Sequence, residues 1–231
     1  MHFSILLLSR SRHEMLESLY YSIKNTCCLD NEIIVGLDED DPQLDNYISK
    51  FSPLSEIRLD IRKRDSNLHN RMNSMIDLIN GKYIFILNDD CLFIDKCWDL
   101  CAYTILNKFG DIVYGKTYDN SIDRISNDYA AFPIVSKIAA KKLGFIMDQT
   151  FGNHGADVMT YRIYADAKKI VDLPCVRIDH IFHNSHEALS KRQNDKTAVD
   201  MISRTFQNNF SINNLLTCDI QEKSNKIKNE N

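Results

Sequence analysis

The sequence lacks three features: an excess of basic residues, a long apolar run and a Cys-x-x-Cys pair. Among its 231 residues, 28 basic side chains face 32 acidic ones, for a net charge of -4. This balance argues against a general nucleic-acid binder, which needs a basic face. No run of about 18 apolar residues occurs, so we expect no membrane-spanning segment.

The cysteines and the N-terminal segment indicate where the protein works. The seven cysteines are an odd number, and the chain is large enough to fold without covalent cross-links. We therefore expect reduced thiols, with Cys91, Cys97 and Cys101 packed as small apolar side chains. The apolar stretch at residues 3–8 is too short for a secretory signal, and its arginines follow it rather than precede it. These features predict an intracellular protein, and we expect it in the cytoplasm.

The rest of the composition is that of an ordinary soluble domain. Hydrophobic residues make up 44% and charged residues 26% of the chain, which is close to the globular average. Disorder, collagen-like repeats and coiled coils are therefore poor descriptions. A domain typically has about 150 residues, and no linker or internal repeat divides this chain, so we expect one fair-sized domain.

Strand-like and helix-like segments alternate along the chain, which is typical of a mostly parallel sheet covered by helices. In the first half we expect strands at residues 2–9, 32–37, 57–61 and 83–87, helices at residues 12–25 and 67–79, and a short helix through Tyr47. In the second half we expect strands at residues 112–114, 130–135 and 176–180, and helices at residues 136–143, 155–168 and 187–208. The sequence thus predicts an α/β domain over residues 1–215, followed by a polar, flexible tail over residues 216–231.

Polar residues follow three of the expected strands. Ser9, Arg10 and Arg12 follow the first strand, Asp38 the second and Asn88-Asp89-Asp90 the fourth. Each group alone is also what a solvated turn contains. In open α/β sheets, however, ligands bind beyond the carboxyl ends of the strands, and these groups would share that edge. The sequence therefore predicts a binding site there.

Asp89 and Asp90 directly follow a hydrophobic strand, where adjacent carboxylates repel each other unless a cation or hydrogen-bond donors neutralise them. A hard divalent ion suits so sparse a site, because Mg²⁺ and Mn²⁺ are held by one or two carboxylates together with substrate phosphates. The ligand implied is a nucleoside diphosphate. An acidic turn without a metal is the alternative at this motif.

Several short motifs occur in a characteristic order: Ser9-Arg10-Ser11-Arg12, the acidic segment Asp38 to Pro42, a helix with Asn67, Arg71 and Asn73, the strand opening Gly81-Lys82-Tyr83, and Asn88-Asp89-Asp90. This series resembles the family 2-like glycosyltransferases of GT-A fold, over roughly residues 3–200. The resemblance implies a nucleotide-binding half at about residues 1–95 and an acceptor-binding half at about residues 96–215.

The resemblance also implies roles for individual residues. The implied nucleotide-binding residues are Ser9, Arg10, Arg12, Asp38, Asn67, Arg71 and Asp89. Asp38 would contact the base and Asp89 the ribose of a UDP- or GDP-type donor, and Asp90 would coordinate Mn²⁺ or Mg²⁺. Asn88 departs from the aspartate of many members, and because an amide is a weaker ligand, we expect a lower metal affinity.

Asp157 is the candidate general base. Residues 151–157 resemble the acceptor-site segment of the family, in which an acidic residue opens a helix. In an inverting transfer, a carboxylate takes a proton from the acceptor hydroxyl as its oxygen attacks the anomeric carbon. An aspartate that merely caps a helix is the alternative. Ala156 stands where the family more usually has glutamate.

Three histidines, His180, His183 and His186, recur every third residue after the last expected strand. A zinc site with Cys175 is one interpretation, but no second cysteine pair completes a tetrahedral set. By resemblance, a histidine after the last core strand completes the metal shell. His180 is the first choice for that role and His183 the second.

We therefore expect a metal-dependent, inverting glycosyltransferase of hexosyltransferase type that moves a sugar from a nucleotide-sugar donor to a hydroxyl of a glycan or related acceptor. Two alternatives remain. A sugar-phosphate nucleotidyltransferase should carry a glycine-rich phosphate loop after the first strand, and Ser9-Arg10-Ser11-Arg12 contains no glycine. A non-catalytic nucleotide- or glycan-binding module of the same fold is the other.

Overall fold

The first half of the chain builds a parallel sheet, as its alternating pattern predicts. The computed structural model describes residues 1–119, 129–149, 155–181 and 210–228. The strands of this half are β1 (Phe3–Leu8), β2 (Asn31–Asp38), β3 (Ile57–Arg62) and β4 (Tyr83–Asn88). Strand β1 runs parallel to both of its neighbours, β2 and β4, and β3 continues the sheet beside β2. The carboxyl ends of β1, β2 and β4 therefore lie at one edge.

The rest of the chain adds further strands to the β4 side of the sheet. They are β5 (Cys91–Phe93), β6 (Tyr114–Asp119), β7 (Ile134–Ser136) and β8 (Ile170–His180). The strand order over the described residues is β3-β2-β1-β4-β7-β6-β8-β5. Strand β7 is antiparallel to β4 and to β6, and β5 is antiparallel to β8. These reversals make the sheet mixed rather than wholly parallel.

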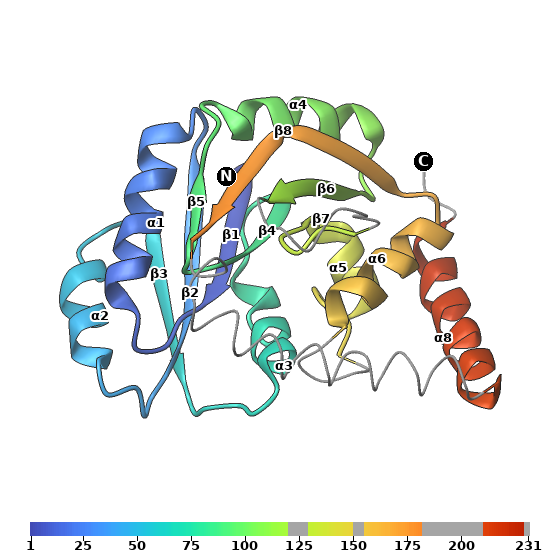
Figure 1. Cartoon of the computed structure of the whole chain (residues 1–231), viewed down its shortest axis with the longest axis horizontal. Coiled ribbons are helices and arrows are strands. Elements are labelled where there is room, and N and C mark those ends of the chain that lie inside the picture. The colour runs from blue at the N-terminus through green and yellow to red at the C-terminus, as the bar shows by residue number, and fades with distance from the viewer. Residues whose placement is uncertain (120–128, 150–154, 182–209, 229–231) are drawn as a thin grey trace.

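Helices cover both faces of the sheet (Figure 1). Their bounds are α1 (His13–Thr26), α2 (Leu44–Phe51), α3 (Leu68–Asn73), α4 (Trp98–Phe109), α5 (Lys137–Leu143), α6 (Ala156–Asp166) and α8 (Phe210–Lys228). Successive side chains of a strand point to opposite faces, so Ile5 and Leu7 pack in the cluster with α1, α2 and α4, whereas Leu6 packs in the cluster with α5 and α6. Because both faces of β1 are buried, its sequence is continuously apolar rather than alternating.

Several predicted elements differ in extent. The strands expected at residues 112–114 and 130–135 are β6 (Tyr114–Asp119) and β7 (Ile134–Ser136). The helix expected at residues 67–79 ends at Asn73 and is followed by a short 3₁₀ helix, Ile76–Leu78. The Ser74 hydroxyl donates to the Arg71 carbonyl oxygen at 2.7 Å, and Asn73 bonds to the backbone of Met147, so local side-chain bonds compete with helix propagation. Strand β8 begins at Ile170, earlier than the expected residue 176. The helix expected at residues 187–208 lies outside the described residues.

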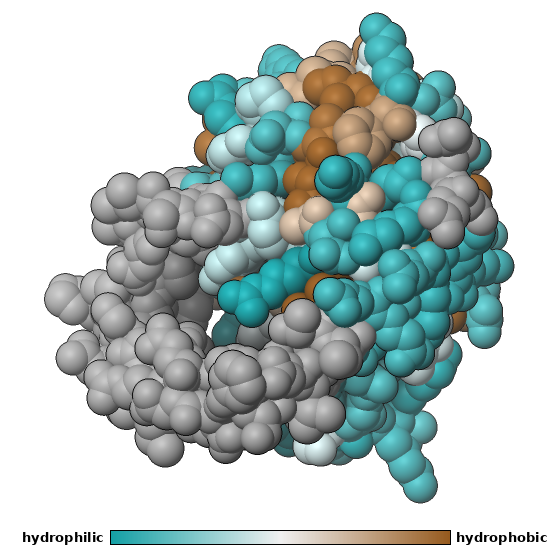
Figure 2. Space-filling model, turned by 90° about the vertical axis from the view of Figure 1, so that its right-hand side faces the viewer, coloured by the Kyte–Doolittle hydropathy of each residue, from teal (hydrophilic) through white to brown (hydrophobic). Residues whose placement is uncertain are grey.

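The prediction of a polar, frayed C-terminal tail is wrong for residues 216–228, which belong to α8. Ile227 is fully buried in the cluster with α5 and α6, and Ser224 donates to Asp166 at 2.5 Å. Lys223 contacts the buried Asp148 at 2.7 Å. A few well-placed contacts, which polar composition does not reveal, therefore hold this helix. Figure 2, viewed from the side on which α8 lies, shows mostly hydrophilic residues among those described.

The expectation of reduced thiols is wrong for one pair of cysteines. A disulfide joins Cys28, after α1, to Cys97, which precedes α4. Cys91 is buried in the hydrophobic cluster with α1, α2 and α4, as expected, whereas Cys101 is only partly buried. The two bonded cysteines are 69 residues apart, and spacing alone gave no indication that the fold brings them together. Within the described ranges, no helix combines the length and the apolar character needed to cross a membrane.

Candidate active site

A cleft of about 510 Å³ opens beyond the carboxyl ends of β1, β2 and β4. Six of the seven predicted nucleotide-binding residues line it: Ser9, Arg10, Arg12, Asp38, Arg71 and Asp89. They come from three strand ends and from α3, which the parallel topology brings to one edge. The site predicted at this edge therefore exists as a cleft with both acidic and basic walls.

The loop after β1 has a fixed backbone. Ser11 adopts a left-handed conformation with φ of 55°, which a non-glycine residue rarely adopts without support. Asp41 supplies that support, because its carboxylate accepts hydrogen bonds from the Ser11 amide at 2.8 Å and from the Ser11 hydroxyl at 3.1 Å. The hydroxyl of the buried Tyr47 accepts a bond from the Arg12 amide at 2.8 Å and pairs with the Ser9 hydroxyl at 2.7 Å. The loop thus presents Ser9 and Arg12 from a rigid base.

Asp89 lies at the centre of the cleft wall and is almost fully buried. Its Oδ2 accepts a hydrogen bond from the Ser9 hydroxyl at 2.6 Å, and its Oδ1 lies 3.3 Å from the guanidinium of Arg12. Burial raises the pKa of this carboxyl, while the bonds to Ser9 and Arg12 act in the opposite direction. Asp89 is therefore held in one orientation by two residues of the β1 loop.

Asp38 lies on a side of the cleft that carries both acidic and basic side chains. Arg10 contacts the carboxylates of Asp38 at 3.0 Å and of Asp40 at 2.6 Å. The hydrogen bond from Arg10 holds the pKa of the exposed Asp40 below its usual range. Arg64 lies 4.0 Å from Asp38 and also lines the cleft. Asp38 is thus flanked by two arginines and remains partly accessible from the cleft.

The two predicted residues of α3 have local roles in addition to their position. Arg71 is 5% exposed and donates to the Asp60 carboxylate at 2.7 Å and to the Asp60 carbonyl at 2.6 Å, although it still borders the cleft. Asn67 caps α3, because its side-chain oxygen accepts bonds from the amides of His69 and Asn70. The described residues that line the cleft do not include Asn67.

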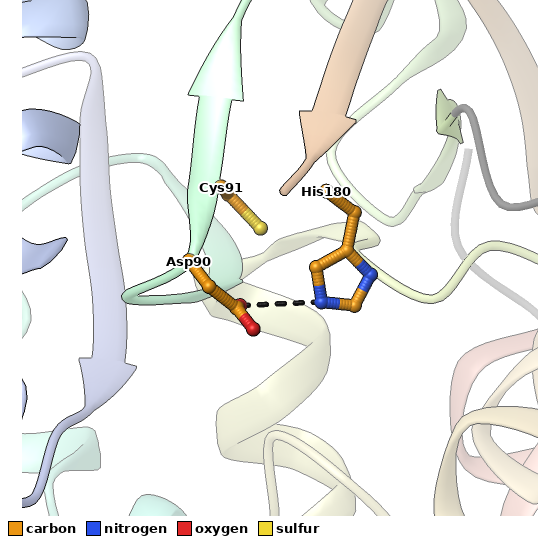
Figure 3. A group of neighbouring side chains, drawn as sticks. All are labelled: Asp90, Cys91 and His180. Carbon is orange, nitrogen blue, oxygen red and sulfur yellow. Dashed lines mark ion pairs between the residues drawn. The ribbon is translucent and has the colours of Figure 1, made fainter. Parts of the chain in front are cut away.

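Asp90, Cys91 and His180 form a cluster of potential metal ligands, in which the ligand atoms lie within 4.8 Å of one another. Cys91 and His180 are partners in the pairing of β5 with β8, which brings the end of β8 beside the Asp89-Asp90 turn. Figure 3 shows the side chains of Asp90 and His180 pointing toward each other, with Asp90 Oδ1 and His180 Nε2 3.2 Å apart. His180 is therefore placed where the sequence predicted a metal ligand.

The donor set fits a divalent cation. Asp90 Oδ1 is buried and accepts no hydrogen bond from a described residue. Adjacent ligands of an octahedral ion with bonds of about 2.0–2.1 Å lie about 2.9 Å apart, close to the 3.2 Å between Asp90 Oδ1 and His180 Nε2. Burial raises the pKa of the Cys91 thiol well above its ordinary value, which disfavours the thiolate that a softer metal would require. Asp90 and His180 are thus the fitting pair.

Asp157 and Cys175 are not joined to this cluster by any contact among the described residues. Asp157 lies in the first turn of α6, where its carboxylate accepts a hydrogen bond from the Val158 amide at 2.9 Å. It lies outside the set of described residues that line the cleft. His183 and His186 fall outside the described residues. Cys175, considered above for zinc, is not part of the Asp90 cluster among the residues described.

Sequence reasoning missed three residues that shape the cleft: Asp41, Tyr47 and Arg64. Asp41 belongs to the acidic segment that follows β2. That position is the one sequence signal that could have pointed to its contact with the loop after β1. The sequence pattern marks Tyr47 only as an apolar residue of a short helix. Its hydroxyl nevertheless accepts a hydrogen bond from the Arg12 amide in the loop after β1.

Comparisons with known proteins agree with this architecture. The family model for glycosyl transferase family 2 matches residues 4–167. The crystal structure of S. aureus TarS 1–349 superposes with a TM-score of 0.62 at 11% identity, covering 78% of this chain and 60% of that chain. The TarS 1–349 complex with UDP-GlcNAc gives a TM-score of 0.60 at 10% identity, covering 78% of this chain and 58% of that one.

These structures are longer than the present chain, which spans about 60% of the first TarS structure. A search of curated proteins finds no match. At such low identity the superpositions establish the fold, and that fold is the GT-A arrangement that the motifs predicted. The family model covers most of the chain, from within β1 through β7, and ends before β8. The chain belongs to glycosyl transferase family 2.

Proposed function

We propose that this chain transfers a sugar from a nucleotide-sugar donor to a hydroxyl group of a glycan or related acceptor. The observation that carries the proposal is the cleft itself, where Ser9, Arg12, Asp38 and Asp89 meet beside the Asp90–His180 pair. Membership of glycosyl transferase family 2 supports the class of reaction. Structures of the similar protein TarS contain UDP and UDP-GlcNAc, so a UDP-type donor is the first to test.

The cleft residues divide the donor between them. We assign Asp38 to the base, because its carboxylate borders the cleft at the end of β2, which β1 separates from the β4 end that carries Asp89. Asp89 is assigned to the ribose hydroxyls, since a carboxylate held by Ser9 is a fixed acceptor. The guanidinium groups of Arg10 and Arg12 supply positive charge for the phosphates.

Asp90 and His180 would hold the divalent cation, Mg²⁺ or Mn²⁺, as oxygen and imidazole donors. Such an ion, when bound, stabilises the negative charge that develops on the departing diphosphate. The ring of Phe132 lies edge-on to His180 at 5.0 Å between centroids, which restricts the imidazole orientation. The protein thus supplies a preset pair of ligands and leaves the remaining positions to phosphate and water.

We assign Asp157 as the general base of an inverting transfer. Its place in the first turn of α6, in the half of the chain expected to bind the acceptor, supports this role. There its carboxylate would accept the proton of the acceptor hydroxyl as that oxygen attacks the anomeric carbon. The hydrogen bond from the Val158 amide to Oδ1 sets the orientation of the group.

The test combines thermal shift with turnover. Wild-type protein is melted with UDP, GDP and their sugars in the presence of Mn²⁺, Mg²⁺ or EDTA, and a ligand at about 100 times its Kd should stabilise the fold by about 2.7 kcal/mol. Asp90→Asn should abolish the metal-dependent shift. Asp157→Asn should keep the shift but release nucleotide from the donor at least about 100-fold more slowly. Asp45→Asn, at an exposed position of α2, is the matched control.

The outcomes separate the candidate functions. A shift with one nucleotide, present with metal and absent with EDTA, supports the transferase and names the donor class. A shift without any donor turnover favours the non-catalytic binding module. No shift with any nucleotide contradicts the proposal, and wild-type turnover in Asp157→Asn removes that residue from the role of base.

A further inference from the structure

Arg12 pairs with two buried carboxylates at once. One nitrogen of its guanidinium lies 3.3 Å from Asp89 Oδ1 and 3.8 Å from Asp90 Oδ2. Asp89 and Asp90 are only 4% and 5% exposed. Two adjacent carboxylates in so little water repel each other, and a neighbouring cation offsets that repulsion. Arg12 therefore supplies positive charge that offsets the repulsion between Asp89 and Asp90.

The four oxygens of the two carboxylates are divided among different partners. Asp89 turns Oδ2 to the Ser9 hydroxyl and Oδ1 to Arg12. Asp90 turns Oδ2 to Arg12 and Oδ1 to His180. Arg12 and the candidate metal-ligand pair thus use opposite oxygens of the same Asp90 carboxylate. The guanidinium does not have to leave for a cation to bind, but its charge is close to that cation.

We propose that Arg12 is a built-in counter-cation that weakens the binding of the divalent metal alone and couples metal binding to the arrival of a nucleoside diphosphate. This inference rests on the proposed function of the cleft. The positive charge of the Arg12 guanidinium repels a divalent cation that binds to Asp90 and His180. The diphosphate brings negative charge that both cations can share, so each should bind better when the diphosphate is present.

The side chain of Arg12 can contact an arriving diphosphate as well as the two carboxylates. It is 37% exposed and lines the cleft, while its backbone amide is anchored to the Tyr47 hydroxyl. Its separations from the carboxylates exceed the roughly 2.7–2.9 Å of a strong charge-assisted bond. A guanidinium has five N–H donors, so it can bind a phosphate without releasing both aspartates.

The experiment measures Mn²⁺ binding by calorimetry in the absence of nucleotide, and then UDP binding at saturating Mn²⁺. Arg12→Gln should bind Mn²⁺ alone roughly tenfold more tightly, the scale of a charge–charge interaction near a protein surface. The same variant should bind UDP roughly tenfold more weakly with metal present, because a charge-assisted phosphate contact is lost. A loss of folding would weaken both ligands, so opposite changes identify the proposed role.

Two further variants control for charge and shape. Arg58→Gln removes the same charge from β3, at an exposed side chain that bonds to the Leu78 carbonyl, and should leave Mn²⁺ binding within about twofold of wild type. Arg12→Lys keeps the charge on a compact ammonium group and should resemble wild type in Mn²⁺ binding more than Arg12→Gln does.

The result that overturns the inference is Mn²⁺ binding by Arg12→Gln that is equal to or weaker than that of wild type. If the wild type binds too little Mn²⁺ to measure, a measurable affinity in Arg12→Gln supports the proposal, and none in either protein contradicts it. The metal-only measurement is independent of the donor. Failure of wild type to bind any nucleotide would therefore reject the proposed function without deciding the Mn²⁺ comparison.

Discussion

Tyr47 shows how a single hydroxyl can position an active site from outside it. The side chain is fully buried between α2 and the sheet, yet its hydroxyl reaches both Ser9 and the backbone of Arg12. Burial raises the pKa of this hydroxyl, so it stays protonated and can donate as well as accept. Tyr47 thereby connects α2 to the two residues that orient Asp89.

We predict that Tyr47→Phe will weaken UDP binding and lower the free energy of unfolding by about 1–3 kcal/mol, because the Arg12 amide loses its acceptor in a partly buried loop. Calorimetry with UDP and Mn²⁺ measures the first effect, and urea unfolding measures the second. Tyr21→Phe, at a tyrosine that is 56% exposed, is the control and should change neither. Unchanged UDP affinity in Tyr47→Phe would show that the loop keeps its conformation without the hydroxyl.

At the scale of residues, the sequence predicted the members of the site better than their contacts. Ser9, Arg10, Arg12, Asp38 and Asp89 follow strands, and parallel strands must end at one edge, so their meeting was predictable. The ion pair between Arg71 and Asp60 was not predictable, because the spacing of the two residues does not determine which carboxylate the arginine contacts. The roles of all these residues toward a nucleotide stay predictions.

At the scale of elements, Glu32 ties three strands together at the edge of the sheet opposite the cleft. Its carboxylate accepts hydrogen bonds from the Ser4 hydroxyl in β1 and from the Asn80 amide at 2.7 Å, in the turn before β4. A Cβ atom at Gly81 would lie 2.4 Å from the Ser4 amide nitrogen, so the turn approaches β1 too closely for a side chain. Glu32 and Gly81 together set the start of β4.

This arrangement predicts a pH-dependent contribution to stability. Burial tends to raise the pKa of Glu32, but the bonds from Ser4, Asn80 and Gly81 outweigh it and leave the pKa lowered. The stability gained is therefore fully present above the unfolded pKa of about 4.3 and is lost as the pH falls through the folded value. Glu32→Gln should cost about 2 kcal/mol at neutral pH, the scale of hydrogen bonds to a charged group.

Urea unfolding at a series of pH values tests this. The difference in the free energy of unfolding between wild type and Glu32→Gln should be constant near neutral pH and should shrink in acid, below about pH 4. Glu14→Gln, at an exposed position in the first turn of α1, is the control. A difference between wild type and Glu32→Gln that stays the same into acid would mean that the charge of Glu32 contributes nothing to the turn.

Most elements of the first half were predictable because each is long enough to show its own period, and β1, β2 and β3 pair in the order of the chain. The second half was less so. Strand β5 has three residues, and its partner β8 lies far along the chain, so no local pattern marks it. Helix α4, which buries Trp98 and Ala102, was not predicted.

At the scale of the whole molecule, the start of α4 is fastened to the α1–β2 connection in two ways. One is the disulfide between Cys28 and Cys97. The other is the fully buried Asp99, whose carboxylate accepts hydrogen bonds from the amides of Cys28 and Leu29 at 2.8–3.1 Å. The non-covalent contacts would keep α4 docked without the disulfide, so the covalent bond adds stability rather than defining the fold.

We predict that Cys28 and Cys97 will resist alkylation until the protein is reduced, whereas the other cysteines whose side chains the structure describes will react after denaturation without reductant: Cys27, Cys91, Cys101 and Cys175. Mass spectrometry of the alkylated protein counts them and identifies the protected pair. Reduction should lower the free energy of unfolding by about 2–4 kcal/mol, since the unfolded chain loses a long closed loop. A Cys28→Ser/Cys97→Ser double variant should show the same loss and no response to reductant.

The alkylation count also bears on where the protein works. Cys28 is exposed, so a reducing compartment would open this bond readily, and disulfides persist chiefly in oxidising surroundings. If protein isolated from its own cells under rapid alkylation has all seven thiols reactive, the expectation of a reduced, cytoplasmic protein holds, and Asp99 and the buried face of α4 hold the helix without the disulfide. If Cys28 and Cys97 are protected, the disulfide forms in the cell, and the cysteine count no longer supports the expected cytoplasmic location, which then depends on the N-terminal segment alone.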